Sequence, residues 1–362
     1  MAIDKENIFL TGSTGFLGSN LLKLFLLEEL IDTVYLLVRP SKQESSFSRI
    51  DKVLLKILEG KECRRNKIVV ISGDISMSKF GLESSLYNDL CEKINRVYHS
   101  AALTGFGIDL KMAQKVNVVG TQNVIDFCLE CKNLRKFNYV GTTFIAGDKE
   151  GEFSEDDFDC GQKFNNYYEQ SKFEAEALVR GVFSDKSFST LIFRPSIILG
   201  GFEKGETSNF KMFYEPVYLF SKKILKVVPA DVDCLHNIVP VDVVAQAIFL
   251  LGQTEEGSAV YHIVNPENVK SGHFVDIAAR FFGYLNPEFI PLRKFNFKDL
   301  TPVQHRLIEP FMPYFNYKSF FVSDKTQKVL KNYGFKYPDI NDEFYLRLFQ
   351  YCCKVGFIKK VK

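Results

Sequence analysis

Tyr168 and Lys172 have the residue types and the spacing of a catalytic acid–base pair. Residues four apart share one face of a helix, so the phenol and the ammonium can point at the same place. A tyrosine with its ordinary pKa of about 10 is a poor acid or base at neutral pH. A neighbouring ammonium favours the phenolate and lowers that pKa toward the working range, so the pair predicts proton transfer at Tyr168.

The same spacing occurs at Tyr218/Lys222 and at Tyr314/Lys318, and position in the chain separates the three pairs. Only Tyr168 follows an apolar segment that ends in hydroxyl residues and precedes another apolar segment. The other two pairs are therefore interpreted as coincidences of spacing.

A glycine-rich turn near the N-terminus is the first element that must position this pair. Residues 7–11 form an apolar, strand-like segment, and a helical pattern follows Gly12, Gly15 and Gly18. Gly12 permits a tight turn, Gly15 lets the backbone approach a pyrophosphate, and Gly18 lets the helix pack close to the strand. Phosphates would then lie at the helix N-terminus, where free N–H groups and the dipole favour negative charge. An ordinary strand-to-helix turn is the alternative interpretation.

Continuous apolar segments alternate with helical patterns along the N-terminal half of the chain. Segments that are apolar on both faces suit central parallel strands covered by helices. We expect strands at 33–38, 67–71, 94–98, 136–140 and 190–195, and helices that include 43–60 and 110–131. This order predicts an α/β fold with a doubly wound parallel sheet of the Rossmann type. Ligands of such sheets lie at the carboxyl ends of the strands, where we find Gly12, Arg39, Asp74, His99 and Thr142.

The residue after the second strand distinguishes between two dinucleotides. NAD enzymes place an acid there for the ribose 2′-hydroxyl, whereas NADP enzymes use a basic residue for the 2′-phosphate. This chain has Arg39, with Lys42 and Arg49 close behind and no acid at the strand end. We therefore predict NADP(H), with a solvated surface arginine as the alternative. Asp74 is expected either to meet the adenine amino group or to cap the next turn, and His99 is interpreted as a structural histidine.

Taken together, these motifs resemble the extended branch of the short-chain dehydrogenase/reductase superfamily. They are residues 11–18, the helix with Asn117, Thr142, the Tyr168/Lys172 pair, and residues 194–196. Further segments are similar to the thioester-reductase and fatty acyl-CoA reductase subgroup: residues 37–41, 73–75, 98–102, 117–121, 168–172 and 237–242. The resemblance covers residues 6–265. One departure is Gly141, where the family usually has serine before the catalytic threonine.

The resemblance implies a role for each site residue. Tyr168 would donate a proton to the carbonyl oxygen while hydride arrives from the nicotinamide, and Lys172 would hold the ribose hydroxyls and tune Tyr168. Thr142 would bind the carbonyl oxygen, with Thr143 as a substitute, and Asn117 would hold a water or backbone group behind Lys172. Preorganised donors of this kind suit the charge that develops on the oxygen. The expected cofactor-binding residues are Gly12, Ser13, Thr14, Gly15, Phe16, Leu17, Gly18, Arg39, Arg49, Asp74, Ile75, Ser100, Ala101, Ala102, Tyr168, Lys172, Pro195 and Ser196.

The C-terminal half predicts a second, smaller unit. We expect a dinucleotide-binding domain over residues 1–195, rejoined by 236–265, and an α/β substrate lobe over 196–235 and 266–362. Residues 200–235 have an irregular pattern and are expected to form a mobile substrate loop. We expect the aromatic segment 295–321 either to cover an apolar acyl tunnel or to pack the lobe's own core or a subunit interface. Its aromatic members are Phe295, Phe297, Phe311, Tyr314, Phe315, Tyr317, Phe320 and Phe321.

Composition excludes several classes of partner. The chain has 362 residues and a formal net charge of +2, so its total charge favours neither nucleic acid nor an anionic membrane. Cys128 and Cys131 have no second pair at zinc spacing, so no metal site is predicted. No uncharged apolar run reaches the roughly 18 residues of a membrane span, and we expect a cytoplasmic protein with free thiols.

These features predict an NADPH-dependent reductase that converts an acyl thioester to an aldehyde or alcohol. The thioester would be carried by coenzyme A or by an acyl carrier protein supplied in trans. The alternative is an NADP-dependent reductase or dehydrogenase of a hydrophobic ketone or alcohol. A sugar-nucleotide epimerase or dehydratase fits less well because of Arg39, and a non-catalytic cofactor-sensing scaffold fits less well because the Tyr168/Lys172 pair is present.

Overall fold

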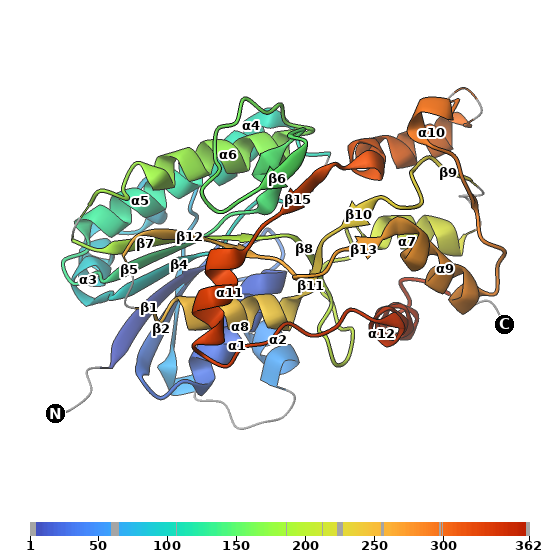
Figure 1. Ribbon diagram of the computed structural model, residues 1–362. Coiled ribbons are helices and arrows are strands. Elements are labelled where there is room, and N and C mark those ends of the chain that lie inside the picture. Colours follow the sequence, from blue (N-terminus) through green and yellow to red (C-terminus); the bar gives the residue numbers. More distant parts are fainter. Residues whose placement is uncertain are drawn as a thin grey trace.

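A seven-stranded parallel sheet forms the centre of the computed structural model, with strand order β12-β7-β5-β4-β1-β2-β3 (Figure 1). Its strands are β1 (Glu6–Thr11), β2 (Ile31–Val38), β3 (Ile68–Ser72), β4 (Arg96–His99), β5 (Lys136–Val140), β7 (Ser189–Pro195) and β12 (Ala259–Ile263). The predicted doubly wound sheet is confirmed. The structure describes residues 5–58, 65–105, 107–185, 187–211, 213–222, 227–254, 257–296, 298 and 300–359. Residues 59–60 of one expected helix and Phe297 lie outside this range.

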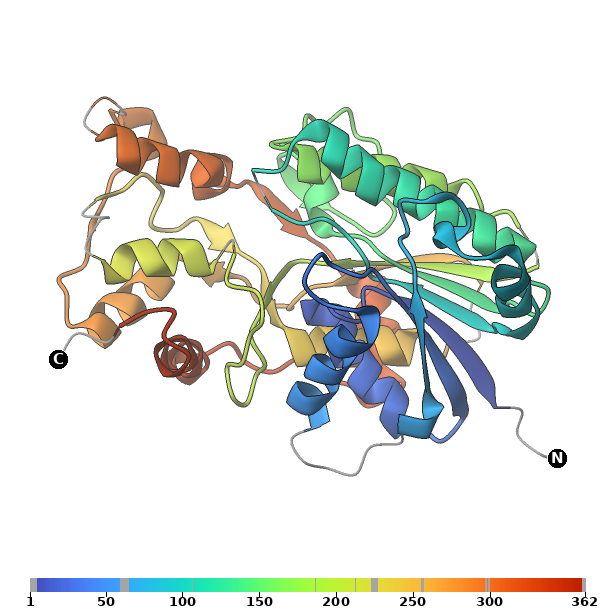
Figure 2. The same ribbon diagram turned by 180° about the vertical axis from the view of Figure 1, so that it is seen from behind.

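Helices cover both faces of the sheet, which explains why its central strands are continuous apolar runs (Figure 2). One face packs against α1 (Phe16–Leu27), α2 (Ser46–Leu58), α8 (Val241–Leu251) and α11 (Asp324–Lys331). The other packs against α3 (Ser84–Lys93), α5 (Gly120–Glu130) and α6 (Tyr167–Arg180). Successive side chains of β1 point to opposite faces of the sheet. Leu10 packs in the core beneath α1 and α8, and Phe9 packs in the core beneath α3 and α5.

The helix expected over 110–131 is interrupted in the structure. It consists of α4 (Leu110–Ala113), a π-helical segment η3 (Gln114–Val119), and then α5. Asn117 is buried in the π-helical segment, whereas its neighbours Val116 and Val118 are only partly buried. Single π-helical turns inside α-helices are frequent at functional sites, and this one places Asn117 beside Ser171 of α6.

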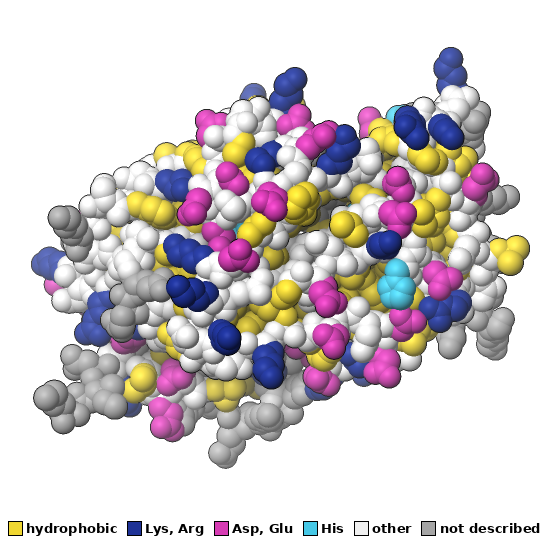
Figure 3. All heavy atoms as spheres, in the orientation of Figure 1, with side chains coloured by type: hydrophobic (Ala, Val, Ile, Leu, Met, Phe, Trp, Pro, Cys, Tyr) yellow, Lys and Arg dark blue, Asp and Glu magenta, His cyan; other side chains and the backbone are white. Residues whose placement is uncertain are grey.

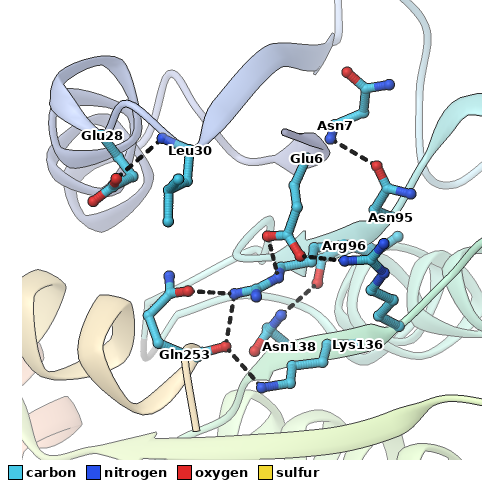
Figure 4. Close-up of polar contacts among 12 residues, drawn as sticks. Glu6, Asn7, Glu28, Leu30, Asn95, Arg96, Lys136, Asn138 and Gln253 are labelled. Atoms are coloured by element: carbon cyan, nitrogen blue, oxygen red, sulfur yellow. Dashed lines mark hydrogen bonds and ion pairs between the residues drawn. The ribbon is translucent and has the colours of Figure 1, made fainter. Parts of the chain in front are cut away.

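A polar network closes the amino ends of the strands, opposite the predicted site (Figure 4). The Arg96 guanidinium lies 2.7 Å from the Glu6 carboxylate. It also donates to the carbonyl oxygen of Gly252 at 2.9 Å and to the Gln253 side chain at 2.8 Å. The Lys136 ammonium donates to the same Gly252 carbonyl. The network therefore ties the end of α8 to β1, β4 and β5.

A smaller lobe lies beyond the carboxyl ends of the strands (Figure 1). Its helical elements are α7 (Tyr214–Ser221), α9 (Ser271–Phe282), α10 (Pro302–Ile308), the 3₁₀ segment η7 (Glu309–Asn316) and α12 (Asp342–Lys354). Short strand pairs join them: β8 (Ile197–Leu199) with β11 (Ile238–Pro240), β9 (Val227–Val228) with β14 (Glu288–Phe289), and β10 (Leu235–His236) with β13 (Val269–Lys270). The prediction that residues 200–235 form an irregular loop was wrong in part. This segment contains α7, and the side chains of Tyr214, Val217 and Phe220 are buried in the lobe core.

The chain returns from the lobe to the parallel-sheet domain after residue 318. There β15 (Ser319–Phe321) pairs with β6 (Gly151–Phe153), and α11 follows. The buried carboxylate of Glu155 accepts hydrogen bonds from the backbone amides of Lys325 and Thr326, both at 2.9 Å, which fixes the start of α11. Residues 319–331 therefore lie on the parallel-sheet domain, whereas the expected division placed them in the lobe.

Acidic and basic side chains are interspersed over the face of the molecule seen in Figure 3. In the part of the chain that the structure describes, no helix is long and apolar enough to cross a bilayer. The described residues also hold no group of three or more His, Cys, Asp or Glu side chains placed to bind a metal ion. The cysteines among them are free thiols.

Candidate active site

The turn between β1 and α1 requires glycine at two positions. Gly12 has a φ of +77°, and a Cβ atom there would lie 2.6 Å from the backbone nitrogen of Ala101. A Cβ atom on Gly18 would collide with the carbonyl oxygen of Gly12. The backbone amide of Gly15 donates to that same oxygen at 2.8 Å and closes the turn. The turn thus approaches the loop after β4 and the start of α1 at distances that only glycine allows.

The start of α1 presents backbone donors toward the carboxyl edge of the sheet. Gly15 is the N-cap, and the first helical hydrogen bond runs from the Ser19 amide to the Gly15 carbonyl at 3.0 Å. The amides of Phe16, Leu17 and Gly18 precede it and have no carbonyl partner within the helix. The buried Ser13 hydroxyl has no hydrogen-bond partner among the described residues. This set of donors at a helix N-terminus fits a pyrophosphate.

Two guanidinium groups lie between this turn and the end of β2. Arg49 donates to the Thr14 hydroxyl at 3.0 Å and to the carbonyl oxygen of Arg39. The Arg39 side chain is 59% exposed, and its guanidinium is 3.9 Å from the Asp74 carboxylate. A contact this long and exposed is weak, so the Arg39 guanidinium is available to a phosphate.

Asp74 and Ile75 follow β3 and have local partners. An Asp74 oxygen accepts a hydrogen bond from the Ser76 amide at 2.9 Å. Asp74 therefore caps the turn after β3, which is one of its two expected roles. The Ile75 carbonyl accepts from the Asn123 side chain at 2.7 Å. Contact of Asp74 with an adenine ring stays a prediction.

His99 ends β4 immediately before Ser100, Ala101 and Ala102. It is buried, with Nδ1 2.7 Å from the Thr11 hydroxyl and Nε2 3.1 Å from the Thr121 hydroxyl. Burial, with a smaller contribution from Lys172, lowers the pKa of His99 to about 3. A neutral, fully hydrogen-bonded imidazole is the structural histidine that the sequence predicted.

Tyr168 and Lys172 lie on α6, next to the end of β5 that Thr142 follows. The Tyr168 side chain is partly buried, and its phenol lies close enough to the Thr142 hydroxyl for that hydroxyl to lower its pKa. The Lys172 ammonium is buried, donates to the carbonyl oxygen of Val140 at 2.8 Å, and lies 4.3 Å from the centre of the Tyr139 ring. The structure therefore places the predicted Tyr168 beside Thr142 and anchors Lys172 on the same helix, at the end of β5.

The pKa values of this pair differ from the sequence-based expectation. Burial raises the pKa of Tyr168 to about 12, against a lowering effect of the Thr142 hydrogen bond and a further increase from Glu169. Burial also lowers the pKa of Lys172 to about 7, although Glu176 opposes that shift. The expectation that Lys172 lowers the pKa of Tyr168 was wrong, because burial penalises the charged forms of both groups. Tyr168 is protonated at neutral pH, as a proton donor must be.

Asn117 holds a backbone segment beside α6. Its side-chain oxygen accepts from the Leu103 amide at 2.7 Å, and its side-chain nitrogen donates to the Leu103 carbonyl at 3.0 Å. The same nitrogen donates to the Ser171 hydroxyl at 2.9 Å. Asn117 thus fixes the loop after β4 against the residue that precedes Lys172.

Pro195 and Ser196 lie at the end of β7, next to the threonines. The hydroxyls of Thr142 and Thr143 are each 3.5 Å from the Pro195 carbonyl oxygen. The Ser196 hydroxyl donates to the Asn237 side chain at 2.6 Å. Contact of Pro195 and Ser196 with a nicotinamide carboxamide stays a prediction.

Comparison with known proteins agrees with this geometry. Residues 10–248 match the NAD-binding family model described as male sterility protein, which is well over half of the chain. The chain belongs to the male sterility protein family. The predicted classification as an extended short-chain dehydrogenase/reductase of the fatty acyl-CoA reductase-like subgroup, with a nicotinamide dinucleotide as cofactor, is therefore confirmed.

The chain is also similar to individual reductases and to solved reductase structures. Fatty acyl-CoA reductase wat of Drosophila melanogaster is 29% identical over 276 residues, which cover 67% of this chain and 53% of that protein. The chain thus spans about half the length of this curated relative. The terminal R domain from the myxalamid PKS-NRPS biosynthetic pathway has the same fold, with a TM-score of 0.86 and 24% identity, covering 100% of this chain and 94% of that chain. A thiolation-reductase di-domain from an archaeal non-ribosomal peptide synthetase has a TM-score of 0.77 and 24% identity, covering 99% and 92%.

The sequence did not predict a buried ionic group that follows the Tyr168/Lys172 pair on α6 of this male sterility family protein. The fully buried Glu176 carboxylate accepts from the Arg194 guanidinium at 2.6 Å and from that of Arg180 at 2.9 Å. Arg194 also lies 3.1 Å from Nε2 of His262. Glu176 is four residues after Lys172, so helical spacing alone would have placed both on one face of α6.

An apolar pocket of about 180 Å³ lies between the parallel-sheet domain and the lobe. Phe144, two residues after Thr142, forms part of its wall, and α7 and α9 supply further aliphatic and aromatic side chains. Its polar lining is sparse and includes His236, Asn237 and Ser271. Six aromatic residues of the predicted segment line it: Phe311, Tyr314, Phe315, Tyr317, Phe320 and Phe321.

Proposed function

We propose that this protein is an NADPH-dependent reductase of acyl thioesters. The observation that carries the proposal is the placement of Tyr168 and Thr142 next to an apolar pocket whose wall begins at Phe144. An acyl chain in that pocket would extend toward the two hydroxyls. Family relatives named fatty acyl-CoA reductases support coenzyme A as the carrier of the acyl group.

The cofactor site of the proposal combines the glycine turn with two arginines. The amides at the start of α1 and the unpartnered Ser13 hydroxyl would hold the pyrophosphate. Arg39 and Arg49 would hold the 2′-phosphate, which supports NADPH over NADH. Lys172 would bind the ribose hydroxyls. A nicotinamide dinucleotide bound here supplies the hydride for the reduction.

Tyr168 and Thr142 would act on the substrate carbonyl. When hydride reaches the carbonyl carbon, negative charge develops on the oxygen, and the neighbouring Tyr168 and Thr142 hydroxyls would donate to it. Tyr168 gives up its proton and a hemithioacetal forms. That species collapses to an aldehyde and a free thiol. Lys172, whose pKa of about 7 lets it gain and lose a proton near neutrality, would return the proton to the site.

The carrier and the location are finer parts of the proposal. An acyl carrier protein in trans is the second thioester donor we propose, because the fold neighbour from a peptide synthetase joins a thiolation domain to its reductase. A cytoplasmic location is proposed because the cysteines among the described residues are free thiols.

The second candidate function is an NADP-dependent reductase of a hydrophobic ketone or alcohol, because the same pocket and hydroxyls suit that carbonyl. A sugar nucleotide fits less well, since it would leave its hydroxyls against aromatic side chains. Purified protein should oxidise NADPH with acyl-CoA thioesters, and Tyr168→Phe should not. Oxidation of NADPH with matched ketones, and with no acyl-CoA, would favour the second candidate function.

A further inference from the structure

The wall of the apolar pocket is attached directly to the catalytic helix. Tyr314 lies in η7, the segment that joins α10 to β15 (Figure 1), and its ring packs edge-on against Phe144 with centroids 5.7 Å apart. Its hydroxyl donates a hydrogen bond to the Glu169 carboxylate and accepts one from the Asn166 side chain at 2.7 Å. The contact therefore joins the substrate lobe to α6 at residues that are 145 positions apart in the chain.

Glu169 is enclosed by donors, one of which comes from the lobe. Its side chain is fully buried, and one oxygen accepts from the Asn165 backbone amide at 2.8 Å and from the Asn165 side chain at 3.1 Å. Burial raises the pKa of Glu169 to about 7, and the hydrogen bonds from Tyr314 and Asn165 oppose that increase. A buried carboxylate is tolerated only when its oxygens have partners, so the Tyr314 hydroxyl is a required part of this environment.

The same residues also fix the start of the catalytic helix. The Asn166 side chain caps α6 by accepting a hydrogen bond from the Glu169 amide at 3.0 Å. Tyr168 lies between these two positions and contacts Thr142, whose hydroxyl accepts from the Phe144 amide at 3.2 Å. One short chain of contacts thus joins the pocket wall to Tyr168.

We propose that Glu169 is a positioning residue that latches Tyr314, and with it the η7 wall of the pocket, onto the catalytic helix. The latch holds the acyl chain so that its reacting carbonyl lies at Tyr168. The inference rests on the proposed function for its substrate, while the latch itself consists of contacts within the protein.

Turnover tests the latch through chain-length dependence. In Tyr314→Phe the wall keeps its ring and loses its hydrogen bond. The ratio of kcat/KM for dodecanoyl-CoA to that for butanoyl-CoA should fall about tenfold, because only the longer chain depends on the full pocket wall. A purely structural role would lower both values in proportion and leave the ratio unchanged, which would overturn the proposal.

Binding tests the latch without turnover. A dansyl-labelled undecanoic acid should bind Tyr314→Phe about tenfold more weakly than the wild type, and the Glu169→Gln/Tyr314→Phe double variant should bind no more weakly than the weaker single variant. Tyr218→Phe makes the same change on the exposed face of α7, outside the pocket, and should bind like the wild type. NADPH affinity, which depends on the distant glycine turn, shows that each variant is folded.

The outcomes separate the latch from the proposed function. A wild type that reduces no thioester but binds the probe through Tyr314 would remove the proposed function and leave the latch standing. Equal probe affinity in the wild type and in Tyr314→Phe, additive effects in the double variant, or no binding of the probe to the wild type would overturn the latch, whatever the turnover.

Discussion

Arg39→Ala should change the choice between the two cofactors. The Arg39 side chain is 59% exposed and its contact with Asp74 is 3.9 Å long, so its loss should cost the fold at most about 1 kcal/mol. A charge-assisted hydrogen bond to a 2′-phosphate contributes about 1.5–3 kcal/mol. The affinity for NADPH should therefore fall by roughly 10- to 150-fold, while the affinity for NADH, which has a hydroxyl there, changes little.

Titration of each cofactor against the purified protein, followed by nicotinamide fluorescence or calorimetry, measures this difference. Lys42→Ala is the matched control, because it removes an exposed positive charge three residues away and leaves both arginines at the glycine turn. The control should lower NADPH affinity by no more than a few-fold. Equal losses of NADPH and NADH affinity in Arg39→Ala, or equal effects of the two variants, would show that Arg39 does not contact the 2′-phosphate.

Three further predictions concern the catalytic pair and the opposite end of the sheet. Tyr168→Phe should lower kcat by about 10²- to 10⁴-fold with NADPH affinity nearly unchanged, since it removes only the proton donor; an active variant in steady-state assays would move that role elsewhere. Lys172 has a lower pKa in the folded chain than its ordinary 10.5, so the unfolded chain binds more protons between about pH 7 and pH 10 and stability should rise with pH there. Urea unfolding at pH 7 and pH 9 should show that rise, at most about 1.4 kcal/mol per pH unit, in the wild type and lose it in Lys172→Met; identical slopes would contradict the assignment. Arg96→Ala should lower the free energy of unfolding by about 2 kcal/mol, because Glu6 keeps only the exposed Arg135 as a cationic partner and the buried Gly252 carbonyl loses a donor, while NADPH affinity stays unchanged; a loss of affinity in the refolded variant would contradict a purely structural network.

The parts of the fold that follow from local pattern were predictable from sequence. The predicted strand 136–140 became β5 without a change of bounds, and the glycine turn has the positive φ at Gly12 that its spacing predicts. These features depend on residues that are close in the chain. The same holds for the Tyr168/Lys172 spacing, because a helix alone places the two side chains on one face.

Features that depend on distant contacts were not predictable. The π-helical segment at Asn117 accompanies hydrogen bonds from that side chain to Leu103 and Ser171, which helical periodicity does not report. The pKa of Tyr168 depends on how deeply the tertiary structure buries it. Tyr314 was set aside as part of a coincidental pair with Lys318, and its contact with Glu169 appears only when the lobe is placed against α6.

The central claim is that Tyr168 and the adjacent pocket reduce an acyl thioester. Its most direct test follows NADPH oxidation and free thiol release together, with dodecanoyl-CoA as the substrate and the matched long-chain ketone as the comparison. We predict that thiol is released in proportion to NADPH oxidised, that the rate increases with acyl length, and that Tyr168→Phe abolishes both signals. Oxidation of NADPH with the ketone and no thiol release from any acyl-CoA would contradict the claim.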